Sequence, residues 1–340
     1  MATRLTWKPD TDSAQRAARV VALHALEGVV KAYDRLSKKD PDSIHDFRVA
    51  IRRLRSWLHL YRPALDDTLR KRTRRRLRRL AHGTTDLRDI DVQIEWLEAE
   101  CTALGAERLE AARWMITALK RERKVAWRSF RKALKRDHSR VMRDLDRELS
   151  RYVVTRDVRS PEDNVTMAAC TERVLHKQAE SLRDALERVR SADDTRRLHR
   201  ARIIAKRARY GIEELAKQAP GLSRAAEDLH RFQDIVGELR DAQLLAHRVS
   251  REVTSVAAER TAIVASELVY QPSGPMNFAR AVAEPPFDAS LALLFARLHD
   301  RISIAARDAT AALGAIATRR LVGHVEQAAG AFGGSKPGRE

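Results

Sequence analysis

The sequence has few of the residues that would tie it to disulfides, membranes or nucleic-acid bases. Cys101 and Cys170 are its only cysteines, so no disulfide framework is expected, and a reducing cytoplasm is the simplest environment. No apolar run approaches the roughly 18 residues of a membrane span, and the first ten residues lack the apolar core of a secretory signal. We therefore expect a soluble, cytoplasmic protein with no membrane partner.

The motifs that usually carry catalysis are also missing. The sequence contains no HExxH, no glycine-rich phosphate loop and no nucleophile elbow. It lacks the clustered acids of a metal-dependent phosphatase, and the Glu98–Glu100 stretch EAE is not followed by the lysine of triphosphate-tunnel enzymes. We expect no enzymatic activity, no catalytic residues, no cofactor and no dedicated metal site.

Positive charge is what the sequence has in excess. Its 66 Lys and Arg against 47 Asp and Glu give a net charge of +19, which favours a polyanionic partner. Residues 1–160 hold 39 basic and 23 acidic side chains, or +16, which leaves +3 for the remainder. We therefore expect the stronger anion site in the first half. Hydrophobic residues make up 44%, enough for a packed core.

The hydrophobic periodicity is helical almost throughout, which predicts an all-α fold. Asp40 is suited to cap a helix that has Pro41 in its first turn, and Ser160 followed by Pro161 has the same pattern. A break is expected near Gly83. The predicted helices span about residues 13–36, 40–62, 64–101, 106–149, 160–189, 193–218, 222–266 and 291–313.

Two motifs recur in the same order at nearly the same spacing. SIHDFRVAIRRLR at 43–55 aligns without gaps with RLHRARIIAKRAR at 197–209, and DLRDIDVQI at 86–94 aligns with ELRDAQLLA at 238–246. Such a pair of matches indicates duplication of a four-helix unit. The predicted organisation is a first half at 10–150, a linker at 151–160, a second half at 161–320 with a loop inserted at about 270–290, and a flexible tail at 321–340.

The stretches HDFRVAIRRLR and LHRARIIAKRARY and the two LRD motifs resemble the CHAD domain, a family of helical domains named for its histidines. The resemblance spans roughly residues 10–320. It implies two pseudo-symmetric antiparallel four-helix bundles with a basic central pore or groove between them. Domains of this family occur in bacteria and archaea, bind inorganic polyphosphate, and in some cases associate with polyphosphate granules and their proteins.

The basic residues themselves form rows along the predicted helices, at steps of three and four residues. A row of like charges beside a core needs carboxylate partners or bound anions, and acids such as Asp89 and Asp241 are too few for all the rows. Arginine grips phosphate oxygens with two donors, whereas lysine acts as a point charge. The predicted polyphosphate-binding residues are His45, Arg48, Arg52, Arg53, Arg55, Lys71, Arg75, Arg78, Arg88, Lys124, Arg128, Arg131, His199, Arg202, Lys206, Arg207, Arg209 and Arg240.

Each assignment has an alternative. The eight basic residues in RKRTRRRLRR at 70–79 equally fit a solvated helix face. His45 and His199 could serve as structural hydrogen-bonding groups or metal ligands, and Arg88 and Arg240 could form salt bridges that fix the helices. For the whole protein, the rival hypotheses are a nucleic-acid-binding protein, with nucleic acid otherwise only a competing polyanion, and an enzyme or accessory domain acting on phosphate chains.

Overall fold

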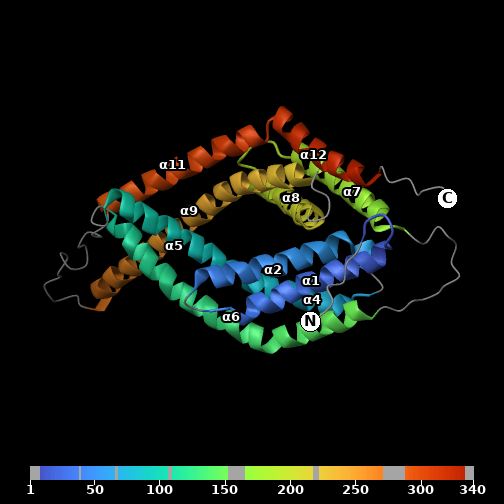
Figure 1. The fold of residues 1–340 in the computed structure, drawn as a ribbon. Helices are drawn as coiled ribbons and strands as arrows, with labels where there is room; N and C mark the ends of the chain where they lie inside the picture. Colours follow the sequence, from blue (N-terminus) through green and yellow to red (C-terminus); the bar gives the residue numbers. More distant parts are fainter. Residues whose placement is uncertain are drawn as a thin grey trace, which may run out of the picture. The chain divides into compact units, whose positions relative to one another are not determined.

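The computed structural model of this chain describes residues 8–37, 40–65, 68–105, 109–151, 165–216, 222–270 and 288–333. The regular structure in these ranges is α-helical, which confirms the all-α prediction (Figure 1). An isolated β-bridge pairs Ser13 with Thr166. These two residues immediately precede the helices that begin at Ala14 and Met167.

The helices follow one another along the chain in the order of their labels. Their bounds are α1 Ala14–Asp34, α2 Pro41–Leu60, α3 Arg62–Leu65, α4 Lys71–Gly83, α5 Thr85–Leu104, α6 Glu110–Ser150, α7 Met167–Glu187, α8 Thr195–Ala216, α9 Ser223–Tyr270, α11 Asp288–Ala312 and α12 Ala315–Gly333.

Several helix ends follow the sequence signals. The Asp40 carboxylate accepts a hydrogen bond from the Asp42 amide at 2.9 Å, with Pro41 in the first turn of α2 as expected. The break expected near Gly83 lies at Thr84, whose hydroxyl donates to the Ala81 carbonyl at 2.8 Å. Gly105 ends α5 with a φ of +86°, which glycine adopts without steric cost.

Two expectations lie outside the described residues: the helix start at Ser160 and Pro161, and most of the loop at 270–290. The described part of α7 begins at Met167, where the Thr166 hydroxyl accepts from the Ala169 amide at 3.2 Å.

The flexible tail predicted from residue 321 is wrong as far as Gly333, because α12 extends to that residue. Apolar side chains on one face of α12 are buried, and the helix packs along α7. The buried residues recur at helical spacing, which stabilises the helix through tertiary contact. They are Leu321, Val322, Val325, Ala328, Ala329 and Phe332.

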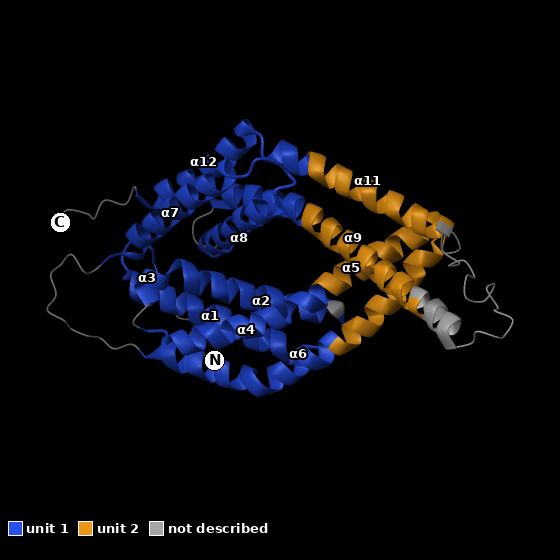
Figure 2. Ribbon diagram, turned by 180° about the vertical axis from the view of Figure 1, so that it is seen from behind, with its two compact units in different colours: residues 1–88, 126–237, 308–340 blue, residues 89–125, 238–307 orange. Residues whose placement is uncertain are grey.

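The chain divides into two compact units (Figure 2). Unit 1 comprises residues 1–88, 126–237 and 308–340, and unit 2 comprises residues 89–125 and 238–307. Each unit therefore contains segments from both halves of the sequence. The arrangement of two pseudo-symmetric bundles around a pore stays a prediction.

Unit 1 is built around α2, which packs against α1, α4 and α8. Phe47, Ile51 and Leu54 of α2 are fully buried. The Trp57 indole N–H donates to the Ala18 carbonyl at 2.9 Å, and the Tyr61 hydroxyl lies 2.9 Å from the Thr171 hydroxyl. Because both polar groups are satisfied inside the core, α2 is fixed to α1 and to α7 without a desolvation penalty.

Unit 2 is held by ion pairs across its helices as well as by apolar packing. Arg297 bonds Glu100 at 2.7 Å and Arg301 bonds Glu238 at 2.6 Å. Arg123 pairs with Asp91, and Arg248 with Glu122. The guanidinium of Arg301 also stacks over the Trp96 ring at 4.9 Å. Most of these arginines therefore have carboxylate partners supplied by the protein itself.

Candidate anion-binding site

The contact between α2 and α8 depends on small residues in α8. Its buried face carries Ala201, Ala205 and Ala208, followed by Gly211. A Cβ atom on Gly211 would lie only 2.5 Å from Cδ1 of Leu60 in α2. Because Gly211 has no side chain, the α8 backbone lies directly against the Leu60 side chain, which brings the basic rows of the two helices close together.

Cations from three helices converge beside this contact. Burial lowers the pKa of the Arg55 guanidinium on α2, and the charges of Arg207, Arg52 and Arg78 lower it further. Burial also lowers the pKa of Arg207 on α8. The predicted site residues Arg52, Arg78 and Arg207 thus lie close enough to Arg55 to repel it.

A pocket of about 400 Å³ opens next to these arginines. Its wall includes His59, which follows Arg55 by one helical turn. Burial lowers the pKa of His59 to about 4, with further contributions from Arg207, Arg62, Arg55 and Arg74. The residues lining the pocket come from α2, α3 and α4; they are Arg55, Leu58, His59, Arg62, Lys71, Arg74, Arg75, Leu77 and Arg78.

No acidic residue is among the described residues that line this pocket. Within the described ranges, Arg55, Arg78 and Arg207 form no ion pair with a carboxylate. Arg55 and Arg207 are half-buried, whereas Arg78 is exposed. Half-buried cations without counter-charge destabilise the unliganded fold, and a bound anion would reduce that cost. We call Arg55, His59, Arg78 and Arg207 the three-helix cluster.

Another group of predicted residues lies at the start of α2. His45 remains exposed in part, and its pKa is lowered by burial, by Arg88 and by Arg48, against the opposing charges of Asp46 and Asp42. Arg48 is 8% exposed. His45, Arg48 and Arg88 therefore form a second, partly acid-balanced group within unit 1.

The row on α8 is held partly by the protein. Arg202 donates from Nε to the Gln233 carbonyl at 3.3 Å, and its guanidinium lies against Gly237, where a Cβ would be 2.9 Å from Nη2. His199 and Lys206 are half-buried on the same helix.

One carboxylate serves two of the predicted residues. Glu213 lies 3.4 Å from Arg209 and 3.5 Å from Arg53. Arg209 also stacks on the Tyr210 ring at 4.7 Å. Arg53 and Arg209 are thus partly neutralised, unlike Arg55 and Arg207.

Some of the remaining predicted residues lie beside the three-helix cluster, and others are joined to it by no described contact. Lys71 and Arg75 line the pocket. Arg128 and Arg131 lie exposed on the unit 1 part of α6. Lys124 and Arg240 belong to unit 2, where Lys124 is exposed and Arg240 half-buried.

Sequence reasoning did not assign His59, Arg62 or Arg74 to the site. His59 continues the row of Arg55 at one helical turn, and that spacing was the available signal. Arg62 lies beyond the end of α2, and Arg74 lies within the basic run of α4. These two arginines line the pocket only because α3 and α4 pack beside α2. That tertiary packing cannot be predicted from a local sequence pattern.

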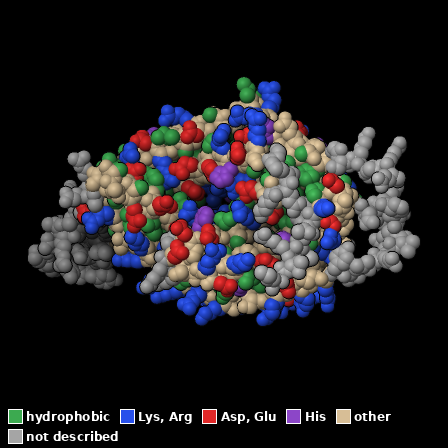
Figure 3. Space-filling view, in the orientation of Figure 1, with side chains coloured by type: hydrophobic (Ala, Val, Ile, Leu, Met, Phe, Trp, Pro, Cys, Tyr) green, Lys and Arg blue, Asp and Glu red, His purple; other side chains and the backbone are tan. Residues whose placement is uncertain are grey.

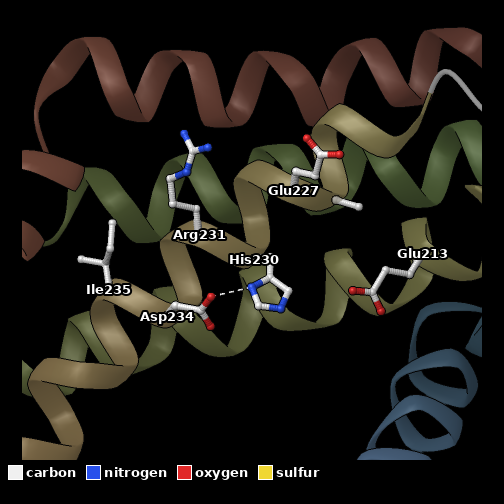
Figure 4. A pocket seen from close by; sticks show the side chains of 7 residues that line it. Glu213, Glu227, His230, Arg231, Asp234 and Ile235 are labelled. Carbon is white, nitrogen blue, oxygen red and sulfur yellow. Dashed lines mark hydrogen bonds and ion pairs between the residues drawn. The ribbon is translucent and has the colours of Figure 1, made fainter.

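A second pocket, of about 470 Å³, has a different character. Its wall includes Glu213, Glu227 and Arg231, with His230 bonded to Asp234 at 2.5 Å (Figure 4). The described residues of the lining carry three carboxylates, against one arginine and one histidine, so this pocket offers no net attraction for a polyanion. Both signs of charge are also interspersed over the face of the molecule shown in Figure 3.

The described residues show neither a metal-binding group nor a membrane-spanning helix. The described residues contain no group of three His, Cys, Asp or Glu side chains placed to hold a metal ion. None of the described helices combines the length and the apolar composition needed to cross a membrane.

Comparison with known proteins identifies a family for most of the chain. A model described as CHAD domain matches residues 19–250. The crystal structure of the CHAD domain from the plant Ricinus communis is similar, with 21% identity, a TM-score of 0.52, and coverage of 88% of this chain and 95% of that chain. PptA from Streptomyces chartreusis is also similar, with 16% identity, a TM-score of 0.53, and coverage of 93% and 100%. No curated protein sequence matches this chain.

Proposed function

The chain belongs to the CHAD domain family, and from this premise we propose that it binds inorganic polyphosphate without chemically altering it. The observation that carries the proposal is the three-helix cluster. Its three arginines have no carboxylate partner among the described residues, and the pKa values of Arg55, His59 and Arg207 are all lowered. A polyanion supplies the missing negative charge.

Polyphosphate suits this arrangement better than nucleic acid does. Side chains one helical turn apart are roughly 5–6 Å from one another, and polyphosphate carries negative charge on every phosphorus along a thin chain. A pocket of about 400 Å³ accommodates a string of phosphates but not a duplex about 20 Å across. The aromatic side chains near the site, Trp57 and Tyr61, are buried in the core and offer no surface for base stacking.

The proposed binding residues fall into a central set and a flanking set. The three-helix cluster, with Lys71 and Arg75, forms the central set. The flanking set retains the other residues assigned from the sequence, and a pore or groove between pseudo-symmetric bundles would bring them onto one path. These residues are His45, Arg48, Arg52, Arg53, Arg88, Lys124, Arg128, Arg131, His199, Arg202, Lys206, Arg209 and Arg240.

The proposed setting follows from the ligand. A protein that binds polyphosphate without turnover is suited to target or organise polyphosphate stores, so we place it in the cytoplasm, at polyphosphate granules and near granule proteins. It needs no metal or cofactor for this role.

Competition tests the proposal. Labelled long-chain polyphosphate is bound to the protein, and unlabelled polyphosphate or duplex DNA is added at equal concentrations of phosphate. The proposal predicts displacement by polyphosphate at concentrations at least about tenfold lower, because only the thin chain enters the pocket. Equal displacement by DNA would show a general polyanion binder. Release of inorganic phosphate from the bound chain would show an enzyme.

A further inference from the structure

The histidine in the basic pocket gives the proposed ligand site a second property. We infer that polyphosphate binding is coupled to uptake of a proton by His59, so that the protein holds polyphosphate more tightly in mildly acidic solution. This inference rests on the proposed function and concerns the regulation of that same site.

His59 is an exposed residue in the wall of the pocket, and described cations of four helices lie around it. Arg55 precedes it on α2, and Arg62 follows on α3. Lys71, Arg74, Arg75 and Arg78 approach from α4, and Arg207 acts from α8. All of these groups stay charged across the neutral and mildly acidic range. His59 is therefore the only described residue lining the pocket whose charge changes there.

In the free protein the imidazole is neutral at pH 7. Burial and the four arginines around it lower the pKa of His59 to about 4. Among the described residues, no carboxylate contributes to this balance in the opposite direction. The neutral ring thus limits the positive charge that the empty pocket must hold.

A phosphate chain in the pocket reverses this balance. Its negative charges offset those of the arginines, and the protonated imidazole gains an acceptor for a charged N–H donor. The pKa of His59 must then rise in the complex. His59 then binds a proton more tightly in the complex than in the free protein. By linkage, the protein binds polyphosphate more tightly when His59 is protonated.

The size of the effect follows from linkage. If the pKa of His59 rises from about 4 to about 6 in the complex, affinity at pH 5 exceeds affinity at pH 7 by roughly tenfold. At pH 5.5 the same shift corresponds to uptake of about 0.7 proton per site on binding.

The experiment measures affinity for long-chain polyphosphate between pH 7.5 and pH 5.0 in the wild type and in His59→Gln. Long chains are used because their internal phosphates do not titrate in this range. The wild type should bind roughly tenfold more tightly at pH 5 than at pH 7. His59→Gln should lose most of this pH dependence, with less than about a twofold difference between its own affinities at pH 5 and pH 7.5, because glutamine does not titrate.

Two controls accompany the measurement. His230→Gln removes an exposed histidine from the second pocket and should keep the full pH dependence. Far-UV circular dichroism at pH 5 confirms that each variant is folded, and His59→Asn replaces His59→Gln if the latter is not. Calorimetry at pH 5.5 in buffers of different ionisation enthalpy counts the protons, which the wild type should take up and the His59 variant should not.

The outcomes separate the two proposals. Binding at pH 7.5 with the same pH dependence in the wild type and the His59 variant would overturn the proton coupling and leave the proposed function standing. Absence of saturable polyphosphate binding at pH 7.5 in the folded wild type would overturn the proposed function itself.

Discussion

The side chain of Leu60 on α2 packs directly over Gly211 on α8, where a Cβ atom would meet Leu60 Cδ1 at 2.5 Å. Both residues are buried. Leu60 directly follows His59 on α2, and Gly211 follows Arg207 on α8 by about one helical turn. A packing detail between two apolar positions thus sets how closely the cations of the three-helix cluster approach one another.

Gly211→Val should therefore lower both stability and ligand affinity. The added methyl groups would overpack the contact and force α2 and α8 apart, at a cost of about 1–3 kcal/mol. Unfolding by urea, followed by circular dichroism, measures the stability change. Polyphosphate affinity is measured on the folded fraction and should fall as well, because the cations separate.

Gly28→Ala is the matched control for this substitution. Gly28 lies in the middle of α1, and a Cβ atom there would have nothing within 4 Å. Alanine at this position should stabilise the protein by up to about 1 kcal/mol through helix propensity. A destabilising effect of similar size at both glycines would show that the Leu60 contact has no special role.

Arg55→Gln should stabilise the unliganded protein slightly while weakening its proposed function. Removing one charge from a cluster without carboxylates relieves repulsion of roughly 0.5 kcal/mol. Loss of one charged hydrogen-bond donor should weaken polyphosphate binding by about tenfold. Thermal unfolding without ligand and equilibrium binding test the two parts. A loss of stability with unchanged affinity would mean that Arg55 is structural.

Arg76→Gln, on α4, should lower stability while leaving polyphosphate affinity nearly unchanged, the reverse of the effects expected for Arg55→Gln. Arg76 is 7% exposed and bonds Asp144 at 3.0 Å, joining α4 to α6. Asp144 keeps Arg147 as a partner at 3.0 Å, so loss of the Arg76 bond should cost about 1–2 kcal/mol of stability. Affinity per folded molecule should change little, since Arg76 lies among the buried residues of α4 and does not line the pocket.

Acid should destabilise the protein through His138. This ring stacks on Tyr33 with centroids 3.6 Å apart and is 5% exposed. Burial lowers the pKa of His138 to about 4, against a small opposing effect of Asp34. Between pH 6.5 and 4 the unfolded chain binds the proton and the folded protein does not, so stability falls as pH decreases, by up to about 3 kcal/mol.

His138→Phe should remove this part of the pH dependence. Phenylalanine keeps the ring against Tyr33 and has no titrating group. The difference in unfolding free energy between pH 7 and pH 4.5 should shrink in the variant. An unchanged difference would mean that other groups govern acid stability.

The sequence predicted the helices well because their signals are local. Asp40 with Pro41 marked the start of α2, and the break beside Gly83 separated α4 from α5. The flexible tail predicted from residue 321 is wrong as far as Gly333, because the apolar residues from Leu321 to Phe332 form a helix that also contains glycines. Packing on α7, which supplies much of the stability of α12, is not visible locally.

The site was predictable in part for the same reason. Spacing identified the rows containing Arg55 and Arg78, because residues three or four apart share a helix face. Arg207 followed from the alignment of 197–209 with 43–55. Spacing could not show that Glu213 pairs with Arg209 and Arg53, or that His138 turns into the core while Arg131 stays exposed. Which cations lack partners is decided by tertiary contacts.

The most direct test removes the charges of the three-helix cluster together. The triple variant Arg55→Gln, Arg78→Gln, Arg207→Gln is compared with Lys177→Gln, Arg188→Gln, Arg190→Gln, which removes the same charge from exposed positions. Affinity for long-chain polyphosphate is measured at one salt concentration, after circular dichroism has shown both variants to be folded. The account predicts a loss of about a hundredfold or more in the cluster variant and less than about threefold in the control. Equal losses in the two variants would contradict it, because the net charge of the chain alone would then explain binding.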